Sequence, residues 1–273
     1  MERRVMALTL ALFVMATQSR AGFSDEGADL SFPEDRPLLF VTHGTKGYDF
    51  TLSAKPGIDL ALDAFLKQGW PVLYLNDCRG DPKYAPYMQE IHPTATICSS
   101  SGGHAVRIRT RNIFIAGGYF KVCAQNTAVT AARRGLQDQI ERAVPGRPTV
   151  VLHYVLDAIY DGSWPRDLLS VGADAALDKF RDFYSSDYYY RQIWPAPDRR
   201  PEVRFLHEDG RVETLRAAES PESSLIILRL ITTGSLANLP ASHRRDHSAS
   251  TSSPRMDLAL TPAARLAGGA FWP

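Results

Sequence analysis

The sequence predicts an α/β protein, a three-layer sandwich around a mainly parallel sheet with a C-terminal β-hairpin added. Two observations carry this prediction. Short apolar runs of the kind that form buried strands alternate with stretches in which apolar residues recur every three or four positions, as in amphipathic helices. Near the end of the chain, residues 203–206 and 212–215 read as strands on either side of Glu208-Asp209-Gly210, which is a typical hairpin turn.

The first elements form a strand, a helix and a strand. Residues 38–41 and 72–75 are continuous apolar runs, and residues 58–66 between them carry apolar side chains at helical spacing until Gly69 ends the helix. A connection of this length makes a right-handed crossover, which gives a parallel sheet. The stretch that follows predicts turns around one short strand, residues 95–98.

A second strand and helix unit comes next. Residues 104–110 alternate apolar and charged side chains, so we expect a half-exposed strand that forms a hairpin with the strand at residues 113–116. The helix that begins near Cys123 has an apolar face of four residues spaced four apart: Ala128, Ala132, Leu136 and Ile140. The remaining predicted elements are a strand at 150–155, a helix at 177–184 and a strand at 225–231.

The amino end has the three parts of a secretory signal peptide. Charged Glu2-Arg3-Arg4 precede a mostly apolar run, residues 5–16, and small residues up to Ala21 supply a cleavage site. The apolar run is shorter than the roughly 20 residues that span a bilayer. We therefore expect residues 1–21 to be removed and no membrane span.

The mature protein is then expected to begin at Gly22 and to be secreted or periplasmic. Residues 30–238 form the predicted α/β domain with its C-terminal extension. Residues 239–273 are rich in Ser, Arg, Ala and Pro without periodicity, so we expect a disordered tail.

The balance of charge bears on partners. With 31 basic and 30 acidic residues, and no basic stripe with aromatic residues between, nucleic acid is not an expected partner. A small-molecule substrate or ligand, or a protein, fits better. No metal-ligand spacing and no glycine-rich phosphate loop occur in the sequence, so no cofactor is expected.

Three cysteines in an exported chain allow one disulfide and one free thiol. Cys78 and Cys98 flank an irregular stretch, and we expect them to pair, which leaves Cys123 free. The alternative is that Cys123 is itself bridged or is a small buried apolar residue.

The segment around Cys123 is the most informative one. A strand breaks at Ala116-Gly117-Gly118, where glycines allow a tight turn, and the helix that starts near the sulfur offers unpaired N–H groups. Such surroundings favour thiolate over thiol.

This segment resembles the nucleophile segment of the isochorismatase-like cysteine hydrolase superfamily. The match rests on residues 115–124 (Ile-Ala-Gly-Gly-Tyr-Phe-Lys-Val-Cys-Ala), on Thr127-Ala128 and on residues 131–135, and weaker similarity extends over residues 37–162. The resemblance implies an α/β fold, a possible homo-oligomer and a hydrolase in which Cys123 attacks a small amide, ester or enol ether.

The family mechanism also uses an Asp at the end of the first strand and a Lys. Thr42 stands at the Asp position, so His43 is the candidate base. No lysine matches, and the candidates for the missing positive charge are Lys46, Lys83, Arg107 and Arg109.

The remaining candidate site residues lie at the ends of predicted strands. The backbone N–H groups from Gly118 to Cys123 are candidate oxyanion donors. Side chains and glycines expected to shape the pocket are Gly117, Gly118, Tyr119, Phe120, Asp77 and Asp157. The two aspartates follow strands at the edge where open α/β sheets carry their sites.

Two other functions stay open. Residues 41–44 (Val-Thr-His-Gly) and 99–103 (Ser-Ser-Ser-Gly-Gly) share features with α/β-hydrolases, which makes Ser101 the nucleophile of an alternative serine hydrolase. With Thr42 in place of Asp, the core is alternatively an inactive scaffold that binds a small molecule or protein.

Overall fold

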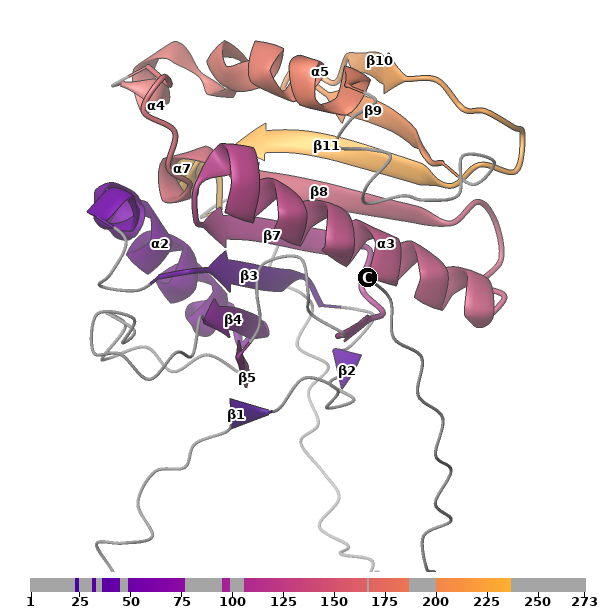
Figure 1. Cartoon of the computed structure of the whole chain (residues 1–273), viewed down its shortest axis with the longest axis horizontal. Helices are drawn as coiled ribbons and strands as arrows, with labels where there is room; N and C mark the ends of the chain where they lie inside the picture. Colours follow the sequence, from indigo (N-terminus) through magenta and orange to yellow (C-terminus); the bar gives the residue numbers. More distant parts are fainter. Residues whose placement is uncertain are drawn as a thin grey trace, which may run out of the picture. The chain divides into compact units, whose positions relative to one another are not determined.

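The structure is a computed structural model, and it describes residues 23–24, 31–32, 36–44, 49–76, 95–98, 106–165, 167–186 and 200–236. In this part of the chain the main sheet has nine strands in the order β1-β5-β4-β3-β7-β8-β11-β9-β10 (Figure 1). Neighbouring strands are parallel except β9 and β10, which form the hairpin predicted from the sequence. The predicted α/β fold with a mainly parallel sheet is therefore confirmed.

The strands of the main sheet have these bounds, in sheet order: β1 Phe23–Ser24, β5 Ala95–Cys98, β4 Val72–Asn76, β3 Leu38–Thr42, β7 Asn112–Gly117, β8 Thr149–Val155, β11 Leu225–Ile231, β9 Glu202–Leu206 and β10 Val212–Arg216. The last strand in the sequence, β11, lies between β8 and β9 and is parallel to both.

Helices cover both faces of the sheet (Figure 1). On one face lies α2 (Asp49–Gln68), and on the other lie α3 (Gln125–Glu141) and α5 (Leu177–Ser185). Shorter helical segments are η2 (Phe120–Ala124), η3 (Leu156–Ala158), α4 (Leu168–Val171), η4 (Ala173–Ala176) and α7 (Thr233–Leu236).

The alternation of side chains along a strand divides the core into two clusters. In β3, Leu38 and Phe40 are fully buried in the cluster that contains α3 and α5, whereas Leu39 and Val41 are fully buried in the cluster that contains α2. Both faces of this strand are covered, which is why its sequence is continuously apolar.

The hairpin predicted for residues 104–110 is wrong. Of the described residues in this range, 106–110, Arg107–Ile108 (β6) form a strand, and it pairs in parallel with β2 (Ser31–Phe32) in a separate two-stranded sheet. The hydroxyl of Thr110 accepts a hydrogen bond from the Asn112 N–H at 3.2 Å, which turns the chain immediately before β7.

The predicted apolar face of α3 is confirmed at three of its four positions. Ala128, Ala132 and Leu136 are buried, but Ile140 is 59% exposed. The helical spacing continues to Ile140, but this residue lies in the last turn of α3, where its side chain is exposed. No helix in the described ranges is long and apolar enough to cross a membrane.

Candidate active site at the carboxyl edge of the sheet

Two glycines bring the end of β7 against the end of β3. Gly117 and Gly118 have φ values of 76° and 73°, which only glycine adopts readily. A Cβ atom on Gly117 would lie 2.3 Å from the carbonyl oxygen of Thr42, so no larger residue fits there. The predicted tight turn after this strand is confirmed.

Gly118 places three residues of the candidate site together. A Cβ atom built on Gly118 would lie 2.7 Å from the Cβ of Cys123 and 3.6 Å from Cγ2 of Thr42. Cys123 is a free cysteine and is partly exposed. Cys123 therefore lies beside Thr42, the residue at which the sequence resemblance implies an Asp.

Cys123 belongs to the π-helical turn η2, which leads directly into α3. Burial raises the pKa of the Cys123 thiol above its ordinary value, although backbone hydrogen bonds from Tyr119 and from Cys123 itself act in the opposite direction. Desolvation of the sulfur thus outweighs the N–H groups that favour the thiolate.

Thr42 carries a hydroxyl where the resemblance implies a carboxylate. It is fully buried, and its Oγ1 lies 2.9 Å from Oγ1 of Thr127, one turn beyond Cys123 in α3. A threonine hydroxyl does not act as a base at neutral pH. This pair fastens β3 to α3 beside the cysteine.

His43 follows Thr42 directly and is also buried. Its φ of 52° is unusual for a residue with a side chain, and its N–H donates to the carbonyl of Leu75 at 3.0 Å. The candidate base thus lies at the same edge of the sheet as the thiol. Its positive φ interrupts the alternation of side-chain directions that continues along β3.

Tyr119 and Phe120 take different positions. Tyr119 pairs with Tyr160, and their rings lie 5.6 Å apart at the end of the sheet. The two segments exchange backbone hydrogen bonds, from Phe120 N–H to Tyr160 O at 2.8 Å and from Tyr160 N–H to Gly118 O at 3.0 Å.

Phe120 itself is buried against Trp164 and Phe180, with ring centroids 5.4 Å and 4.6 Å away. It therefore anchors the cysteine turn in the core, whereas Tyr119 remains at the surface beside the site. Simple packing thus accounts for Phe120, although the sequence also allowed it to line a pocket.

Asp157 serves as a helix cap. Its carboxylate accepts hydrogen bonds from the Thr233 N–H, at 2.9 Å and 3.2 Å, and from the Thr233 hydroxyl. The Asp157 backbone lies against α2, because a Cβ atom on Gly57 would lie 2.0 Å from its carbonyl oxygen. These contacts fasten α7 and α2 to the end of β8.

Other candidates lie outside the described residues or away from the thiol. Five candidates lie outside the described residues, so their roles stay predictions: Asp77, Lys46, Lys83, Cys78 and Ser101. Arg107 and Arg109 flank Ile108, which packs near Gly135 in the second half of α3. They lie at the opposite edge of the sheet and do not bring positive charge to Cys123.

One charged group near the site was missed from the sequence. The Lys179 ammonium lies 3.1 Å and 3.2 Å from the two carboxylate oxygens of Asp161, and it also contacts the Ser163 hydroxyl. Burial raises the pKa of the Asp161 carboxyl, but hydrogen bonds from Ser163 and the charge of Lys179 together lower it below its ordinary value.

Asp161 follows Tyr160, so this group lies next to the turn that carries the cysteine. The Asp-Gly-Ser sequence at residues 161–163 was the available signal, since an aspartate in such a turn binds the backbone two residues on. The lysine was not recognisable because it comes from α5, far along the chain.

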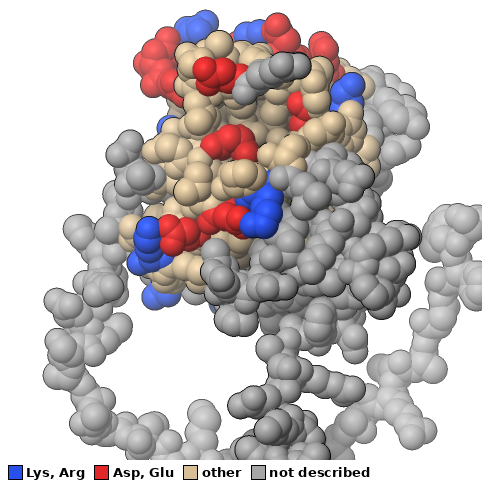
Figure 2. Space-filling model, turned by 90° about the vertical axis from the view of Figure 1, so that its left-hand side faces the viewer, with Lys and Arg blue, Asp and Glu red and all other residues tan. Residues whose placement is uncertain are grey.

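The charges around this edge are mixed. Figure 2 shows acidic and basic side chains close to one another, with uncharged atoms between them. Among the described residues no group of three His, Cys, Asp or Glu side chains is arranged to hold a metal ion.

Comparisons with known proteins gave structural similarities only. No family model and no curated protein matches the chain. An N-carbamoylsarcosine amidase from Thermoplasma acidophilum matches with a TM-score of 0.31 and 16% identity, over 50% of this chain and 91% of the amidase.

A cysteine hydrolase from Pseudomonas syringae pathovar phaseolicola matches with a TM-score of 0.36 and 13% identity, over 77% of this chain and 94% of that protein. The evidence for chemistry in this chain is the geometry of its own residues.

Proposed function

We propose that this protein is an exported cysteine-dependent hydrolase of a small amide, ester or enol ether, with Cys123 as the nucleophile. One observation carries the proposal. A free cysteine lies at the carboxyl edge of a parallel sheet, in a turn whose backbone N–H groups point to its sulfur. This edge is where open α/β sheets place their sites.

For an amide or an ester, the reaction begins with transfer of the Cys123 proton to a base as the sulfur attacks the carbonyl carbon. The negative charge on the carbonyl oxygen is stabilised by backbone N–H groups between Gly118 and Cys123. The amine or alcohol then leaves with a proton, and water hydrolyses the thioester to release the acid and the thiol.

His43 is the proposed base. Thr42 and Thr127 cannot take the proton, whereas an imidazole has an ordinary pKa near neutrality and can do so. Because burial raises the pKa of the Cys123 thiol, His43 takes the proton as the sulfur attacks the substrate.

Export is part of the proposal and rests on the signal-like sequence of residues 1–21. In an oxidising compartment Cys78 and Cys98 would be bridged, and Cys123 would remain as the working thiol. Mass spectrometry of the exported protein tests both points, through the mass of its first peptide and through the peptide that contains the bridge.

A second function is favoured by a different observation. With the Thr42 to Thr127 hydrogen bond, a neutral pair stands where the resemblance implies a charged base, which suits a core retained for binding. In that case the same edge binds a small molecule or protein without turnover.

Three variants distinguish these functions. We expect a panel of small amides, esters and enol ethers to contain a substrate that the wild-type protein turns over. Cys123→Ala should abolish turnover, and His43→Gln should lower kcat more than it raises KM and should change the pH profile. Ser101→Ala serves as the control, because it disables only the alternative serine hydrolase.

The opposite results are equally informative. Turnover that survives in Cys123→Ala but is lost in Ser101→Ala contradicts the proposal and supports the serine hydrolase. If a panel member binds without being converted, and neither variant changes its binding, the scaffold is the better description.

A further inference from the structure

The turn at residues 160–164 pairs with the segment that leads into the cysteine turn η2. The Tyr160 N–H donates to the carbonyl of Gly118 at 3.0 Å, and the Tyr160 carbonyl accepts from the Phe120 N–H at 2.8 Å. These two bonds fall on the residues before and after Tyr119. Tyr160 therefore sets the orientation of the backbone at Tyr119.

The peptide unit between Gly118 and Tyr119 connects this pairing to the sulfur. In a planar trans peptide the C=O and the N–H point in opposite directions. The Gly118 carbonyl accepts from Tyr160 on one side of the unit, and the Tyr119 N–H, on its other side, donates to the Cys123 sulfur. Rotation of this unit would weaken both hydrogen bonds together.

A charged pair fixes the residue that follows Tyr160. The Asp161 side chain is only 2% exposed, and the Lys179 ammonium of α5 lies 3.1 Å from its carboxylate. The same carboxylate accepts from the N–H and the hydroxyl of Ser163, at 2.9 Å and 2.7 Å. Because the pair is largely removed from water, separating it would leave a buried charge without compensation. The position of the 160–164 turn thus depends on Lys179.

Helix α5 also holds the cysteine turn. Phe180, next to Lys179, packs on Phe120 with ring centroids 4.6 Å apart. Trp164 packs on Phe120 as well, at 5.4 Å, and its N–H donates to the Asp161 carbonyl at 3.1 Å. The helix therefore contacts the cysteine turn through an apolar side chain and the 160–164 turn through an ammonium group.

We propose that Asp161 and Lys179 are positioning residues for Cys123, and that their ion pair holds the 160–164 turn so that the Tyr119 N–H stays directed at the sulfur. This inference rests on the proposed role of Cys123 as the nucleophile. Neither charged side chain takes part in making or breaking bonds, and the pair acts through the backbone hydrogen bonds of Tyr160.

The first test is the rate at which iodoacetamide alkylates Cys123 in the full chain at neutral pH, with the label located by mass spectrometry. In Lys179→Met the thiolate should lose the hydrogen bond from the Tyr119 N–H. Such a loss lowers the thiolate fraction about tenfold, and the higher nucleophilicity of a more basic thiolate offsets about threefold of it. We therefore expect alkylation to be about threefold slower than in the wild type and to rise at higher pH.

Two further variants separate the charge from the packing. Lys179→Arg keeps the positive charge, so its alkylation rate should return toward that of the wild type. Asp161→Asn keeps an oxygen for Ser163 but loses the charge, so it should be slowed as Lys179→Met is. If Lys179→Met does not fold, Asp161→Asn and Lys179→Arg give the same comparison.

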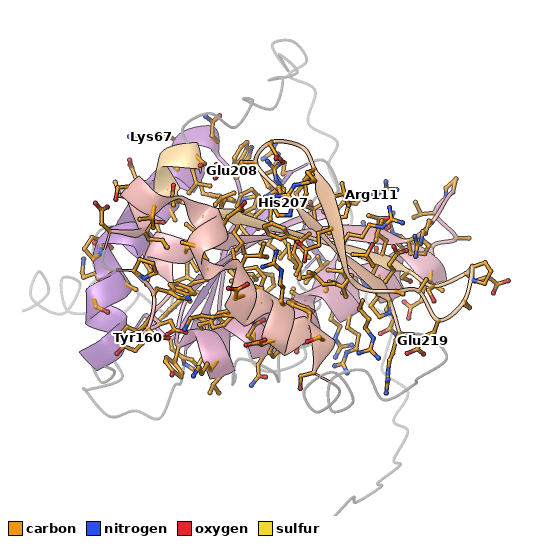
Figure 3. All side chains as sticks on the ribbon, turned by 90° about the horizontal axis from the view of Figure 1, so that it is seen from above. Lys67, Arg111, Tyr160, His207, Glu208 and Glu219 are labelled. Atoms are coloured by element: carbon orange, nitrogen blue, oxygen red, sulfur yellow. The ribbon has the colours of Figure 1, made fainter. Side chains whose placement is uncertain are left out.

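Arg181→Met is the matched control on the same helix. Arg181 pairs with Glu213 of the hairpin at 2.8 Å, and Glu213 contacts His207, which Figure 3 shows well apart from Tyr160. The variant therefore removes an ion pair of α5 that lies outside the 160–164 turn. Its alkylation rate should equal that of the wild type.

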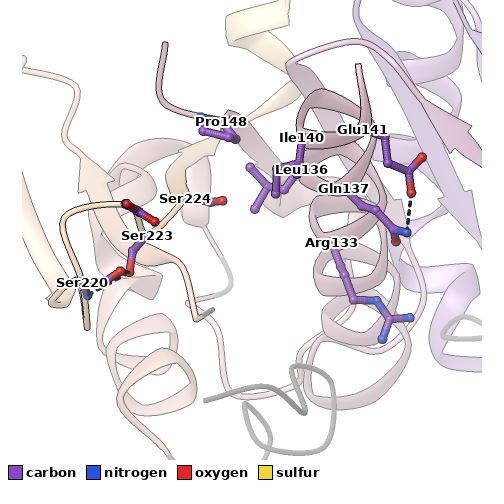
Figure 4. A pocket seen from close by; sticks show the side chains of 10 residues that line it. Arg133, Leu136, Gln137, Ile140, Glu141, Pro148, Ser220, Ser223 and Ser224 are labelled. Atoms are coloured by element: carbon purple, nitrogen blue, oxygen red, sulfur yellow. Dashed lines mark hydrogen bonds between the residues drawn. The ribbon is translucent and has the colours of Figure 1, made fainter. Parts of the chain in front are cut away.

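A second control uses α3, the helix that follows the cysteine turn. Gln137 donates to the Glu141 carboxylate at 2.7 Å, on the wall of a cavity of about 770 Å³ that lies beside the second half of α3 (Figure 4). This hydrogen bond is roughly 20 Å from Cys123 along the helix. Gln137→Ala should leave the alkylation rate unchanged.

Amide hydrogen exchange gives a readout that needs neither thiol chemistry nor a substrate. The N–H groups of Tyr160 and Phe120 should exchange at least about tenfold faster in Lys179→Met, and at the wild-type rate in Arg181→Met. Where a substrate is known, Lys179→Met should lower kcat more than it raises KM. Failure of the proposed hydrolase activity would leave the exchange and alkylation results interpretable.

Three results would overturn the proposal. One is a folded Lys179→Met protein that is alkylated as fast as the wild type or faster, since faster labelling would show only looser packing around the sulfur. Another is equal slowing in Arg181→Met, since any loss from α5 would then have the same effect. The third is slowing in Lys179→Arg as large as in Lys179→Met, since the charge would then play no part.

Discussion

The Cys123 thiol is subject to two opposing influences from its surroundings. Burial favours the neutral thiol, whereas the N–H groups of Tyr119 and Cys123 favour the thiolate, and burial is the stronger of the two. A cysteine of this kind reacts slowly with general reagents and needs a base delivered at the moment of attack.

The reactivity of Cys123 should therefore rise only at high pH. We expect alkylation by iodoacetamide, followed by mass spectrometry, to give an apparent pKa above the ordinary value of 9.0. Labelling in denaturant should be faster at the same neutral pH, because desolvation is then lost. An apparent pKa well below the ordinary value would mean that the backbone N–H groups outweigh burial.

Gly118 holds the cysteine turn against β3, so its replacement should be costly. Gly118→Ala places a Cβ 2.7 Å from that of Cys123 at a left-handed φ, and we expect it to lower the free energy of unfolding by at least about 3 kcal/mol.

Gly210→Ala is the matched control for this substitution. Gly210 has a φ of 84° but nothing within 4 Å of the added Cβ, so only the backbone cost of about 1–2 kcal/mol should appear. Urea denaturation measures both variants. Equal effects would show that the contact with Cys123 contributes nothing.

Single residues were predictable from the sequence where backbone geometry determines them. Gly117 and Gly118, at the end of β7, predicted a tight turn, and the structure has one. The partners of the side chains were not predictable, because Thr42 meets Thr127 and Asp157 meets Thr233 across 85 and 76 positions of sequence.

At the scale of elements, an ionic network joins α5 to the β9–β10 hairpin. Arg181 of α5 donates to both carboxylate oxygens of Glu213 at 2.8 Å, and the His207 ring lies between Glu213 and Asp174, at 3.3 Å and 3.1 Å. Arg211 also approaches the His207 ring, at 3.3 Å. The hairpin is thus tied to the domain by charges as well as by its pairing with β11.

This network predicts a loss of stability in acid. Hydrogen bonds from Arg181 lower the pKa of Glu213 from its ordinary 4.5 to about 2. The carboxylate therefore stabilises the fold above pH 4.5, and this contribution disappears as the pH falls through about 2. Thermal melts between pH 5 and 2 should fall less steeply for Glu213→Gln than for the wild type.

The same melts with Glu208→Gln give the control, since Glu208 is an exposed residue of the hairpin turn. Its acid slope should equal that of the wild type. If Glu213→Gln has the wild-type slope as well, other carboxylates carry the acid transition.

Elements were predictable where both period and length agreed. The spacing of Leu177, Phe180 and Tyr184 gave α5, and all three are buried. The alternation in residues 104–110 indicated a strand that is only two residues long, because Thr110 turns the chain and β2 is the partner. Local alternation specifies a pleat but not the strand that pairs with it.

At the scale of the whole molecule, the last described core residue is Leu236, which is buried against the α2 side of the sheet. The sequence predicts that residues 239–273, which lie outside the described residues, form a disordered tail. A chain that ends at residue 238 should therefore keep the melting temperature of the full chain within about 2 °C.

Calorimetry of the two chains measures this difference. A melting temperature that falls by several degrees on truncation would contradict the prediction, since the tail would then contribute to the folded core.

The order of the strands in the sheet was not predictable from the sequence. Period and length identify β8, β9, β10 and β11, and crossover rules make the core parallel. No local sequence pattern indicates that β11 lies between β8 and the hairpin. Its position depends on which strand edges remain unpaired after the other strands have formed.

The position of β11 has a consequence for the chain as it is made. Synthesis proceeds from the amino end, so β8, β9 and β10 all emerge before the strand that joins them. Until residue 231 has left the ribosome, β8 presents an open edge and the hairpin has no partner in the sheet. A translation product that stops short of this residue would therefore contain two separate pieces with exposed edges, and aggregation would compete with folding.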